Sequence, residues 1–426
     1  MNRLSPILID VAVIGAGPAG ISACLELDKS SNMNIALFDR STIVGGMPRS
    51  CHFPFGMRDQ KIITTGTKYA NRLERLVHDT SVKVHTESTV VNIHPAIADG
   101  EHIIDVASTD GYLSYQCKNL ILATGCFEIS QGARMLPGTR PTGVFTTGML
   151  QDIVKIRHQK FQRRVVIVGS ELVSLSSILT LREAGATIVA MIEEDDNVHC
   201  YPPIAKVMSS VYGFPIYRHT EIQSILGIEQ VEGIELKDKN EDANYTIECD
   251  CILITGKFRP YSALIDETSI ERDPNTFGPS VDTNFMTSVA NIYAVGNVIR
   301  GVHMHDLCAL EGKAAAKNII NKVKGTSENN NDGFYLSTES PIEYIAPQKI
   351  LLDATTTHKI SSLTPGCAIQ LIQTLKNPTI EAWSGSQLLW KKSYRRLLAN
   401  SRISIPIWEF DFNQIEINST IILKVT

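Results

Sequence analysis

The feature of the sequence that most constrains its fold is a glycine-rich turn, Gly15–Gly20, that lies between two apolar runs. The first run is Asp10–Ile14, and an alanine-containing amphipathic stretch separates the turn from the second run, Asn34–Asp39. Apolar runs that flank a helical stretch in this way predict the order strand, turn, helix and strand. This order is the first unit of a doubly wound α/β domain.

The turn and an acidic residue beyond it match the fingerprint of a dinucleotide site, G-x-G-x-x-G. The first glycine allows a tight turn, the second leaves room for a pyrophosphate against the backbone, and the third lets the helix pack close to the strand. Asp39 lies nineteen positions after Gly20, where its carboxylate can accept hydrogen bonds from an adenosine ribose. The predicted contact residues are Gly15, Ala16, Gly17, Pro18, Ala19, Gly20, Asp39 and Arg40.

A second unit with the same order begins at Arg164. The apolar run Arg164–Val168 is followed by Gly169, by a helical stretch at Leu172–Glu183 and by a further apolar run, Ala186–Ile192. Two such units predict an α/β chain with two doubly wound, Rossmann-like dinucleotide-binding domains. The buried-strand patterns Asn119–Gly125 and Cys251–Gly256 are expected to form the last strands of the two units.

The segment after the second unit returns to the pattern of the first. The stretch Asn291–Asn297 and an alanine-rich helix at Leu310–Val323 predict that the second domain is inserted in the first. A polar, asparagine-rich segment at Lys324–Gly333 predicts a linker, and the short alternating runs from Ile342 to Thr426 predict a small β-rich domain. The predicted boundaries are 1–155 with 285–325 for the first domain, 156–284 for the second and 334–426 for the third.

Three further motifs resemble those of the pyridine nucleotide-disulphide oxidoreductase-like flavoproteins, namely Gly45–Arg49, Ala123–Gly125 and Tyr293–Asn297. The resemblance covers roughly residues 8–320 and implies that the first unit binds FAD and the second NAD(P)H. Within that group, Ala123–Ser130 and Leu136–Gly148 look like the FAD subunits of sarcosine oxidase, opine oxidase, hydroxyproline dehydrogenase and hydrogen cyanide synthase. The resemblance adds the following residues to the FAD site: Gly45, Gly46, Ala123, Thr124, Gly125, Gly296 and Asn297.

Asn297 departs from the family, which usually has aspartate at this position. An amide can still form hydrogen bonds with ribityl hydroxyls or phosphate, so the prediction of FAD binding stands. The alternative for Asn297 is a helix cap with no role in cofactor binding.

The fingerprint of the second unit is degenerate. It begins at Gly169, but Glu171 replaces its second glycine and Ser174 its third. Glu171 puts an anion where a pyrophosphate must approach, and its carboxylate can itself occupy the helix N-terminus. The sequence therefore predicts poor or absent NAD(P) binding; if binding occurs, Glu193 and Glu194 favour NADH, because a 2′-phosphate would meet two carboxylates.

The candidates for chemistry lie in two loops. Arg49 and His52 follow the Gly45–Gly46 pair, where the resemblance places the flavin ring, and could steady reduced flavin or an anionic substrate; the alternative is a loop packed by its phenylalanines. His305, with its neighbours His303 and Asp306, is the second candidate, for proton transfer. The spacing of these residues predicts no metal site. Dithiol chemistry is excluded, because no Cys-x-x-Cys or Cys-x-x-x-x-Cys pair lies near Gly45 or in the second unit.

Composition limits the partners. The 40 basic and 45 acidic residues give a net charge of −5 without long charged runs, so neither nucleic acid nor an anionic membrane surface is expected. No apolar run is long enough to span a membrane. The nine cysteines are scattered and odd in number, which favours a reducing, cytoplasmic compartment.

These observations predict an FAD-dependent oxidoreductase. The first hypothesis is a dehydrogenase, or a subunit of a heteromeric dehydrogenase, that acts on a small amine or polyol-type substrate. Its electrons would pass to a second flavoprotein subunit or another acceptor, since a closed second site removes NAD(P)H. The alternatives are an NAD(P)H-dependent flavin reductase and a non-catalytic FAD-binding scaffold subunit.

Overall fold

The first apolar run forms β1 (Ile7–Ile14), a central strand of a seven-stranded sheet. The computed structural model describes residues 5–426 except 31, 53, 98–99, 327–331, 353–365, 401 and 414. Strand β1 pairs in parallel with β2 and β8, and β8 pairs in parallel with β19. The sheet order is β5-β2-β1-β8-β7-β6, with β19 beside β8. The bounds of these strands are Ile35–Phe38 (β2), Lys83–His85 (β5), Thr89–His94 (β6), His102–Ser108 (β7), Gly111–Leu122 (β8) and Ile292–Ala294 (β19).

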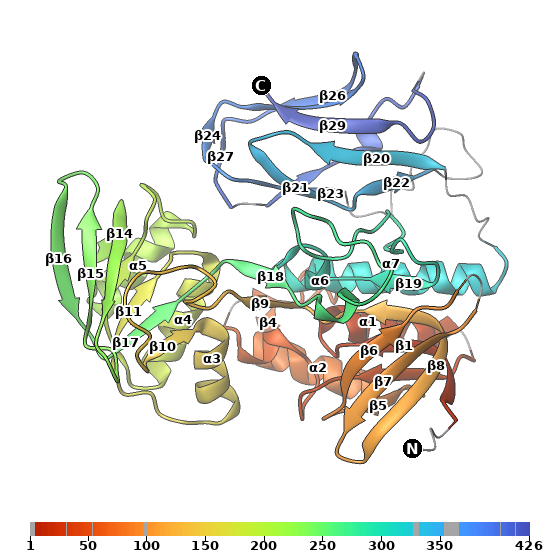
Figure 1. The fold of residues 1–426 in the computed structure, drawn as a ribbon, viewed down its shortest axis with the longest axis horizontal. Coiled ribbons are helices and arrows are strands. Elements are labelled where there is room, and N and C mark those ends of the chain that lie inside the picture. Colours follow the sequence, from red (N-terminus) through yellow and green to blue (C-terminus); the bar gives the residue numbers. More distant parts are fainter. Residues whose placement is uncertain are drawn as a thin grey trace.

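Two helices from distant parts of the sequence pack against each other beside this sheet (Figure 1): α1 (Pro18–Ser30) and α7 (His305–Val323). Gly312 permits the close approach, because a Cβ at this position would lie 2.0 Å from the Ala19 carbonyl oxygen. Helix α7 begins before the predicted start at Leu310. The remaining helices of this unit are η1 (Met47–Ser50), α2 (Gly66–His78) and α6 (Asn297–Arg300), and a short hairpin joins β3 (Pro54–Phe55) to β4 (Thr64–Thr65).

The second unit contains a parallel five-stranded sheet of order β10-β17-β11-β12-β13. Helix α4 (Leu172–Glu183) has the predicted bounds. Strand β10 (Val144–Thr146) pairs with β17 in this sheet. It therefore lies in the sheet of the second unit, although the predicted boundary between the first and second domains is at residue 155. The domain boundaries stay a prediction. The other elements of the sheet and its helices are α3 (Thr147–Gln151), η2 (Asp152–Ile156), β11 (Arg164–Val168), β12 (Thr187–Ile192), α5 (Pro202–Tyr212), β13 (Ile216–Tyr217) and β17 (Cys251–Ile254). An antiparallel sheet of β14 (Thr220–Leu226), β15 (Gly233–Asp238) and β16 (Ala243–Glu248) lies beside it.

Two short antiparallel strands connect the first two units (Figure 1): β9 (Cys126–Glu128) and β18 (Phe258–Pro260). After β18 and a short helix, η3 (Ala263–Ile265), the chain returns to the first sheet through β19. The predicted α/β class, with one Rossmann-like unit inserted in the other, is confirmed.

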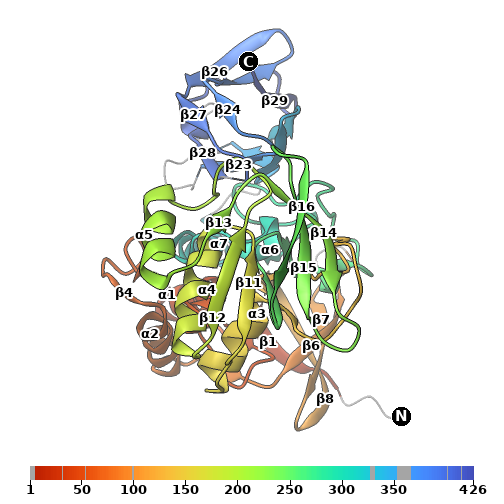
Figure 2. The ribbon, with the colours of Figure 1, turned by 90° about the vertical axis from the view of Figure 1, so that its left-hand side faces the viewer.

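The C-terminal unit consists of strands, as predicted, and lies above the other two units in Figure 2. Its core includes Phe334, Ile369, Trp390 and Leu423. One sheet has the order β22-β20-β29-β25-β26 and another the order β21-β23-β28. The elements are β20 (Gly333–Thr338), β21 (Ile342–Ala346), β22 (Lys349–Leu351), β23 (Cys367–Leu371), β24 (Leu375–Lys376), β25 (Thr379–Ser384), β26 (Gln387–Ser393), β27 (Arg396–Leu397), β28 (Arg402–Ile405), η4 (Ile407–Glu409) and β29 (Thr420–Val425).

The predicted linker at 324–333 includes residues 327–331, which lie outside the described residues. Within the part of the chain that the structure describes, no helix is both long and apolar enough to cross a membrane.

Candidate cofactor and substrate site

A cavity of about 2510 Å³ lies where the three units meet. Its wall includes the Gly15–Gly20 turn and the starts of α6 and α7 from the first unit. The second unit contributes the start of α4 and the end of β12, and the C-terminal unit contributes residues of β21, β23 and β28. All three units therefore contribute to the wall of one cavity.

The three glycines of the first fingerprint have different surroundings. A Cβ at Gly15 would lie 2.3 Å from the Ala123 carbonyl oxygen, and one at Gly20 would lie 1.9 Å from the Gly15 carbonyl oxygen. A Cβ at Gly17 would meet nothing within 4 Å. Gly15 and Gly20 are thus required by packing, whereas Gly17 keeps a space open at the N-terminal end of α1. This is the space that the pyrophosphate of a dinucleotide needs.

Asp39 and Arg40 lie beside this turn. The Asp39 carboxylate accepts hydrogen bonds from the backbone N–H groups of Ala16 (2.7 Å) and Ser41 (2.8 Å), so it braces the turn against the loop after β2. The Arg40 guanidinium lies over the ring of Tyr261, 4.7 Å from its centroid. Tyr261 carries no motif and was not predicted. Contact of Asp39 and Arg40 with the cofactor stays a prediction.

The Gly45–Gly46 pair lies directly against the turn. The Gly45 N–H donates to the Ala16 carbonyl oxygen (2.8 Å), and a Cβ at Gly46 would lie 2.9 Å from the Gly17 Cα. Ala123 and Gly125 line the same cavity, and the Thr124 hydroxyl donates to the Tyr261 carbonyl oxygen at 2.6 Å. The structure therefore brings the predicted FAD-site residues of these loops together around one cavity.

The Arg49 guanidinium is engaged on all sides. It donates to the Val44 carbonyl oxygen, to Asn71 Oδ1 at 2.8 Å and to Glu74 Oε2 at 2.9 Å. These bonds tie η1 to α2 and leave no guanidinium nitrogen without a protein partner. The geometry does not favour the predicted catalytic role of Arg49.

His52 lies at the junction with the second unit. Its Nε2 is 3.3 Å from Glu183 Oε2, and its Nδ1 is 3.5 Å from the Thr180 hydroxyl oxygen. Burial lowers the pKa of His52, and the Glu183 carboxylate opposes that shift. The side chain is not among those that line the cavity. We therefore assign His52 to the contact between the units, and the geometry does not favour its predicted catalytic role.

His305 does line the cavity, at the start of α7. Its Nε2 accepts a hydrogen bond from the Gly56 N–H at 2.9 Å, and its ring packs on Phe55 with 4.1 Å between centroids. Burial lowers the pKa of His305, and the Asp306 and Asp59 carboxylates oppose that shift. A neutral imidazole that accepts at Nε2 carries its proton on Nδ1. His305 can therefore donate a hydrogen bond, but its acceptor nitrogen is already used.

Asn297 and Gly296 form hydrogen bonds with other residues of the protein. Asn297 Oδ1 accepts from the His303 N–H (2.8 Å) and from Cys308 Sγ (3.1 Å), which supports the alternative of a structural role. The Gly296 N–H donates to Glu311 Oε2 at 2.8 Å, and Glu311 forms a buried ion pair with Arg300. No sequence motif marks this pair, because Arg300 ends the short helix α6 and Glu311 lies within the alanine-rich helix α7.

The second fingerprint is filled by its own side chain. A Cβ at Gly256 would lie 2.0 Å from Glu171 Oε1, and a Cβ at Gly169 would lie 2.7 Å from Glu171 Oε2. The Thr255 hydroxyl is 3.1 Å from Glu171 Oε2, and the Ser174 hydroxyl is 3.4 Å from the same oxygen. The carboxylate thus occupies the space between two glycines at the start of α4, as the sequence predicts for Glu171.

Arg134 closes the same space from the other side, and sequence reasoning missed it because it lies in a loop without a motif. Its guanidinium donates to the carbonyl oxygens of Ile129 (2.9 Å), Thr255 (2.8 Å) and Gly256. Burial lowers the pKa of Arg134, and the charge of Glu171 opposes that shift, so the two groups lie within electrostatic reach.

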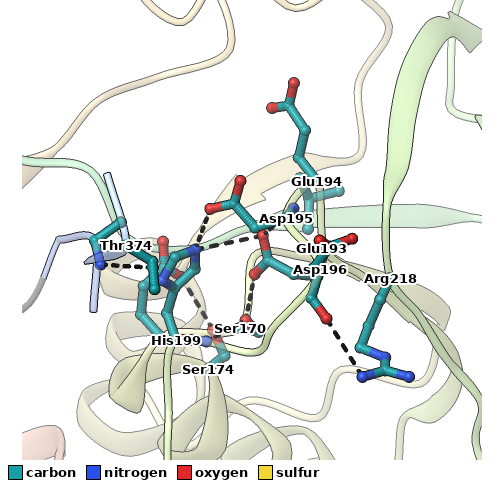
Figure 3. Close-up of polar contacts among 12 residues, drawn as sticks. Ser170, Ser174, Glu193, Glu194, Asp195, Asp196, His199, Arg218 and Thr374 are labelled. Carbon is teal, nitrogen blue, oxygen red and sulfur yellow. Dashed lines mark hydrogen bonds and ion pairs between the residues drawn. The ribbon is translucent and has the colours of Figure 1, made fainter. Parts of the chain in front are cut away.

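Glu193, the acid at the ribose position of the second unit, is also engaged internally. Figure 3 shows Glu193, Asp195 and His199 pointing toward one another. Glu193 accepts from the Ser170 hydroxyl and from the Asp195 N–H (3.0 Å), while His199 Nε2 is 2.7 Å from Asp195 Oδ2 and 3.6 Å from Glu193 Oε1. Burial raises the pKa of Glu193. The hydrogen bonds among Glu193, Asp195 and His199 and with Ser170 hold these side chains together.

Known proteins match the part of the chain that contains the first two units. The family model described as pyridine nucleotide-disulphide oxidoreductase matches residues 9–317. The chain belongs to this family. Its members that match are FAD-dependent oxidoreductases, so the protein is an enzyme of this class and its cofactor is FAD.

Individual members of the family are distant. Dihydrolipoyl dehydrogenase of Bacillus subtilis (strain 168) is 23% identical over 349 residues, which cover 74% of this chain and 70% of that enzyme. The match covers 63% of the mitochondrial enzyme of Canis lupus familiaris, so the chain spans less than two thirds of the length of such relatives.

Two solved structures show the fold. T. acidophilum thioredoxin reductase has a TM-score of 0.62 and 20% identity, covering 74% of this chain and 99% of that one. L-proline dehydrogenase from P. horikoshii has a TM-score of 0.55 and 19% identity, covering 77% of this chain and 58% of that one.

The cysteines of this family member do not form a disulphide. All nine are free. Burial raises the pKa of Cys51, the nearest to the Gly45–Gly46 pair, to about 12, and that of Cys126 to about 12. Thiols with such pKa values stay protonated and unreactive near neutral pH.

Proposed function

We propose that this flavoenzyme is a dehydrogenase that oxidises a small amine or polyol-type substrate and passes the electrons to a protein partner, without NAD(P)H. The observation that carries the proposal is the Glu171 carboxylate between Gly169 and Gly256. A nucleotide pyrophosphate would have to displace this carboxylate, and it would meet a negative charge at the helix end that ordinarily attracts phosphate. The ribose would likewise compete with the bonds that Glu193 already makes.

The residues of the first unit fit FAD. Gly17 leaves open space at the N-terminal end of α1, and the Gly45–Gly46 loop, Thr124 and the start of α6 surround that space. We assign the pyrophosphate to this end of α1, where backbone N–H groups and the helix dipole favour an anion. When bound, FAD supplies a two-electron acceptor for the oxidation of the substrate.

The start of α7 makes the electrostatic environment of the cavity more positive. Its helix dipole presents partial positive charge to the cavity, and the Nδ1–H of His305 adds a hydrogen-bond donor there. Both favour negative charge that develops in the cavity during reduction. His305 acts in this proposal as a fixed donor rather than as a general base, because the Gly56 N–H occupies its Nε2.

Two resemblances support the substrate class. One structural neighbour bears the name L-proline dehydrogenase. The segments Ala123–Ser130 and Leu136–Gly148 look like the FAD subunits of sarcosine oxidase and its relatives. Both concern small amines or amino acids. The same resemblance supports a second flavoprotein subunit as the electron acceptor, and the nine free cysteines support a cytoplasmic location.

Anaerobic mixing of the FAD-loaded protein with NADH tests the proposal, with the flavin absorbance as the readout. We expect the oxidised spectrum to persist. Bleaching within milliseconds would contradict the proposal and support the alternative of an NAD(P)H-dependent flavin reductase. In a second experiment, photochemically reduced flavin should pass its electrons to an artificial acceptor; failure to do so would support a non-catalytic scaffold.

A further inference from the structure

The C-terminal unit presents a polar row to the cavity from the sheet β21-β23-β28. Tyr344 lies opposite Gln370, and Gln370 lies opposite Arg402, on the three neighbouring strands. All three residues line the cavity, together with Glu343. The row is therefore placed to touch any substrate that enters between the C-terminal unit and the first unit.

Arg402 is the positively charged residue of this row, and its hydrogen bonds connect the C-terminal unit to the first unit. Its Nε donates to the Tyr344 hydroxyl oxygen at 2.8 Å, and its Nη2 donates to the Arg300 carbonyl oxygen at 3.0 Å. Its Nη1 is buried and has no hydrogen-bond partner among the described residues. A guanidinium held by two of its three nitrogens thus keeps one nitrogen without a bond.

Arg402 differs from Arg300 and Arg58 in having no ion-pair partner among the described residues. Arg300 is neutralised by Glu311, and Arg58 is neutralised by Asp306 at 3.4 Å. Within the part of the chain that is described, no carboxylate forms an ion pair with Arg402. The carboxylate of Glu343 instead accepts a bond from Gln370 Nε2 at 2.7 Å.

A neutral histidine completes this part of the wall. Burial and the charges of Arg300, Arg402 and Arg58 hold the pKa of His303 well below its usual value. The imidazole therefore adds no charge of its own, and Arg402 keeps its positive charge without an ion-pair partner among the described residues. A charge removed from water is costly unless an opposite charge accompanies it. A ligand with one negative charge would supply the ion-pair partner that Arg402 lacks.

We propose that Arg402 binds the carboxylate of the substrate, so that the substrate is a small amino acid or hydroxy acid. A carboxylate matches the unpaired charge of Arg402, and Nη1, the nitrogen without a partner, can form a charge-assisted hydrogen bond with one of its oxygens. The site rests on the proposed function, which it narrows from amines and polyols to compounds that carry a carboxylate. In this proposal the C-terminal unit contributes to substrate selection.

Titration of the FAD-loaded protein with simple carboxylates tests this site without turnover. The probes are acetate and benzoate, and acetamide and benzamide are their uncharged counterparts. We expect the carboxylates to change the visible spectrum of the flavin and the amides to leave it unchanged. Arg402→Gln should weaken carboxylate binding by about 10- to 100-fold, the range for a lost bond between charged groups. Arg402→Lys should retain part of the affinity, because it keeps the charge.

Arg395→Gln is the matched control, since Arg395 is an exposed arginine of the same unit. It should leave carboxylate binding unchanged. Equal binding by Arg402→Gln and the wild type would overturn the proposal, as would the absence of any spectral response to both carboxylates. Loss of FAD from Arg402→Gln or Arg402→Lys would assign the guanidinium to the cofactor pyrophosphate and would also overturn it. Rapid reduction by NADH would refute the proposed function and leave this binding result standing.

Discussion

The two Rossmann-like units begin with the same strand, turn and helix, and only one of the two turns is open. At Gly17 the space beside the backbone is empty, whereas at the corresponding position of the second unit the Glu171 carboxylate fills it. The strands and helix of the second unit are still formed around the filled site. The comparison teaches that the scaffold of a nucleotide site can persist when one side chain has closed the site itself.

The open site depends on a buried ion pair, and breaking that pair should have the largest effect. Arg300→Met leaves the Glu311 carboxylate buried without its cation, and we expect the protein to lose about 3–5 kcal/mol of stability. Urea unfolding of the FAD-loaded protein measures this loss. Arg300→Met combined with Glu311→Gln is the control, and it should recover part of the stability. An unchanged unfolding midpoint in the single variant would show that the pair is dispensable.

Copying the closed turn into the open one should remove the cofactor. Gly17→Glu places a carboxylate in the empty space, and we expect FAD affinity to fall at least about 100-fold, which corresponds to about 2.7 kcal/mol. The ratio of flavin absorbance to protein absorbance after gel filtration measures the loss. Gly132→Glu is the matched control, because Gly132 is exposed and also has nothing within 4 Å of its missing Cβ. Full FAD occupancy in Gly17→Glu would place the cofactor elsewhere.

The reverse change should partly open the closed turn. Glu171→Gly removes the carboxylate from between Gly169 and Gly256, and we expect NADH to bind about 10-fold more tightly, a gain of about 1.4 kcal/mol. Arg134 and Glu193 still occupy their places, so the gain is limited. Fluorescence titration with NADH measures the affinity. Glu241→Gly, the same change at an exposed position of the second unit, is the control. The same affinity in Glu171→Gly and the wild type would show that the carboxylate does not close the site.

The acid at the ribose position of the second unit should make the stability of the protein depend on pH. Burial raises the pKa of Glu193 in the folded state above its value in the unfolded chain. Its contribution to stability is therefore present below the ordinary pKa of glutamate and is lost as the pH rises through the raised value. Glu193→Gln should remove this loss, by about 1.4 kcal/mol for each unit of difference between the two pKa values.

Urea unfolding between pH 4 and pH 8 measures this smallest effect. Glu194→Gln is the control, because Glu194 is an exposed neighbour that pairs with Lys239. A parallel pH dependence in the wild type and Glu193→Gln would mean that Glu193 is as easily ionised in the folded protein as in the unfolded chain.

Much of the fold follows from local sequence patterns. The predicted bounds of α4 agree with the structure, because an apolar run, a turn and a helical stretch are all contiguous. Helix α7 starts before its prediction at Leu310, since His305 and Asp306 hide the helical pattern of its first turn. Strand β10 lies in the second sheet because it pairs with β17, a contact between segments more than a hundred residues apart that no local pattern records.

The candidate site divides in the same way. Spacing alone identifies Glu171 as a residue that closes the site, because it stands at the position of the second glycine in a known fingerprint. Arg134 and Arg402 carry no such position, and only the folded chain brings them to the cavity. Arg49 and His52 lie in the loop that the motif marks, but their side chains turn to Glu74 and Glu183. A sequence motif places a loop, whereas the direction of each side chain depends on partners elsewhere in the chain.

The close contact of Gly312 with Ala19 also has a consequence for synthesis. The strands and helices of the second unit come from one continuous stretch of chain, so that unit can assemble as soon as it has left the ribosome. The first unit cannot, because α7 and β19 complete it only after the second unit has been made. We therefore expect the open cofactor site to form later on the growing chain than the closed site.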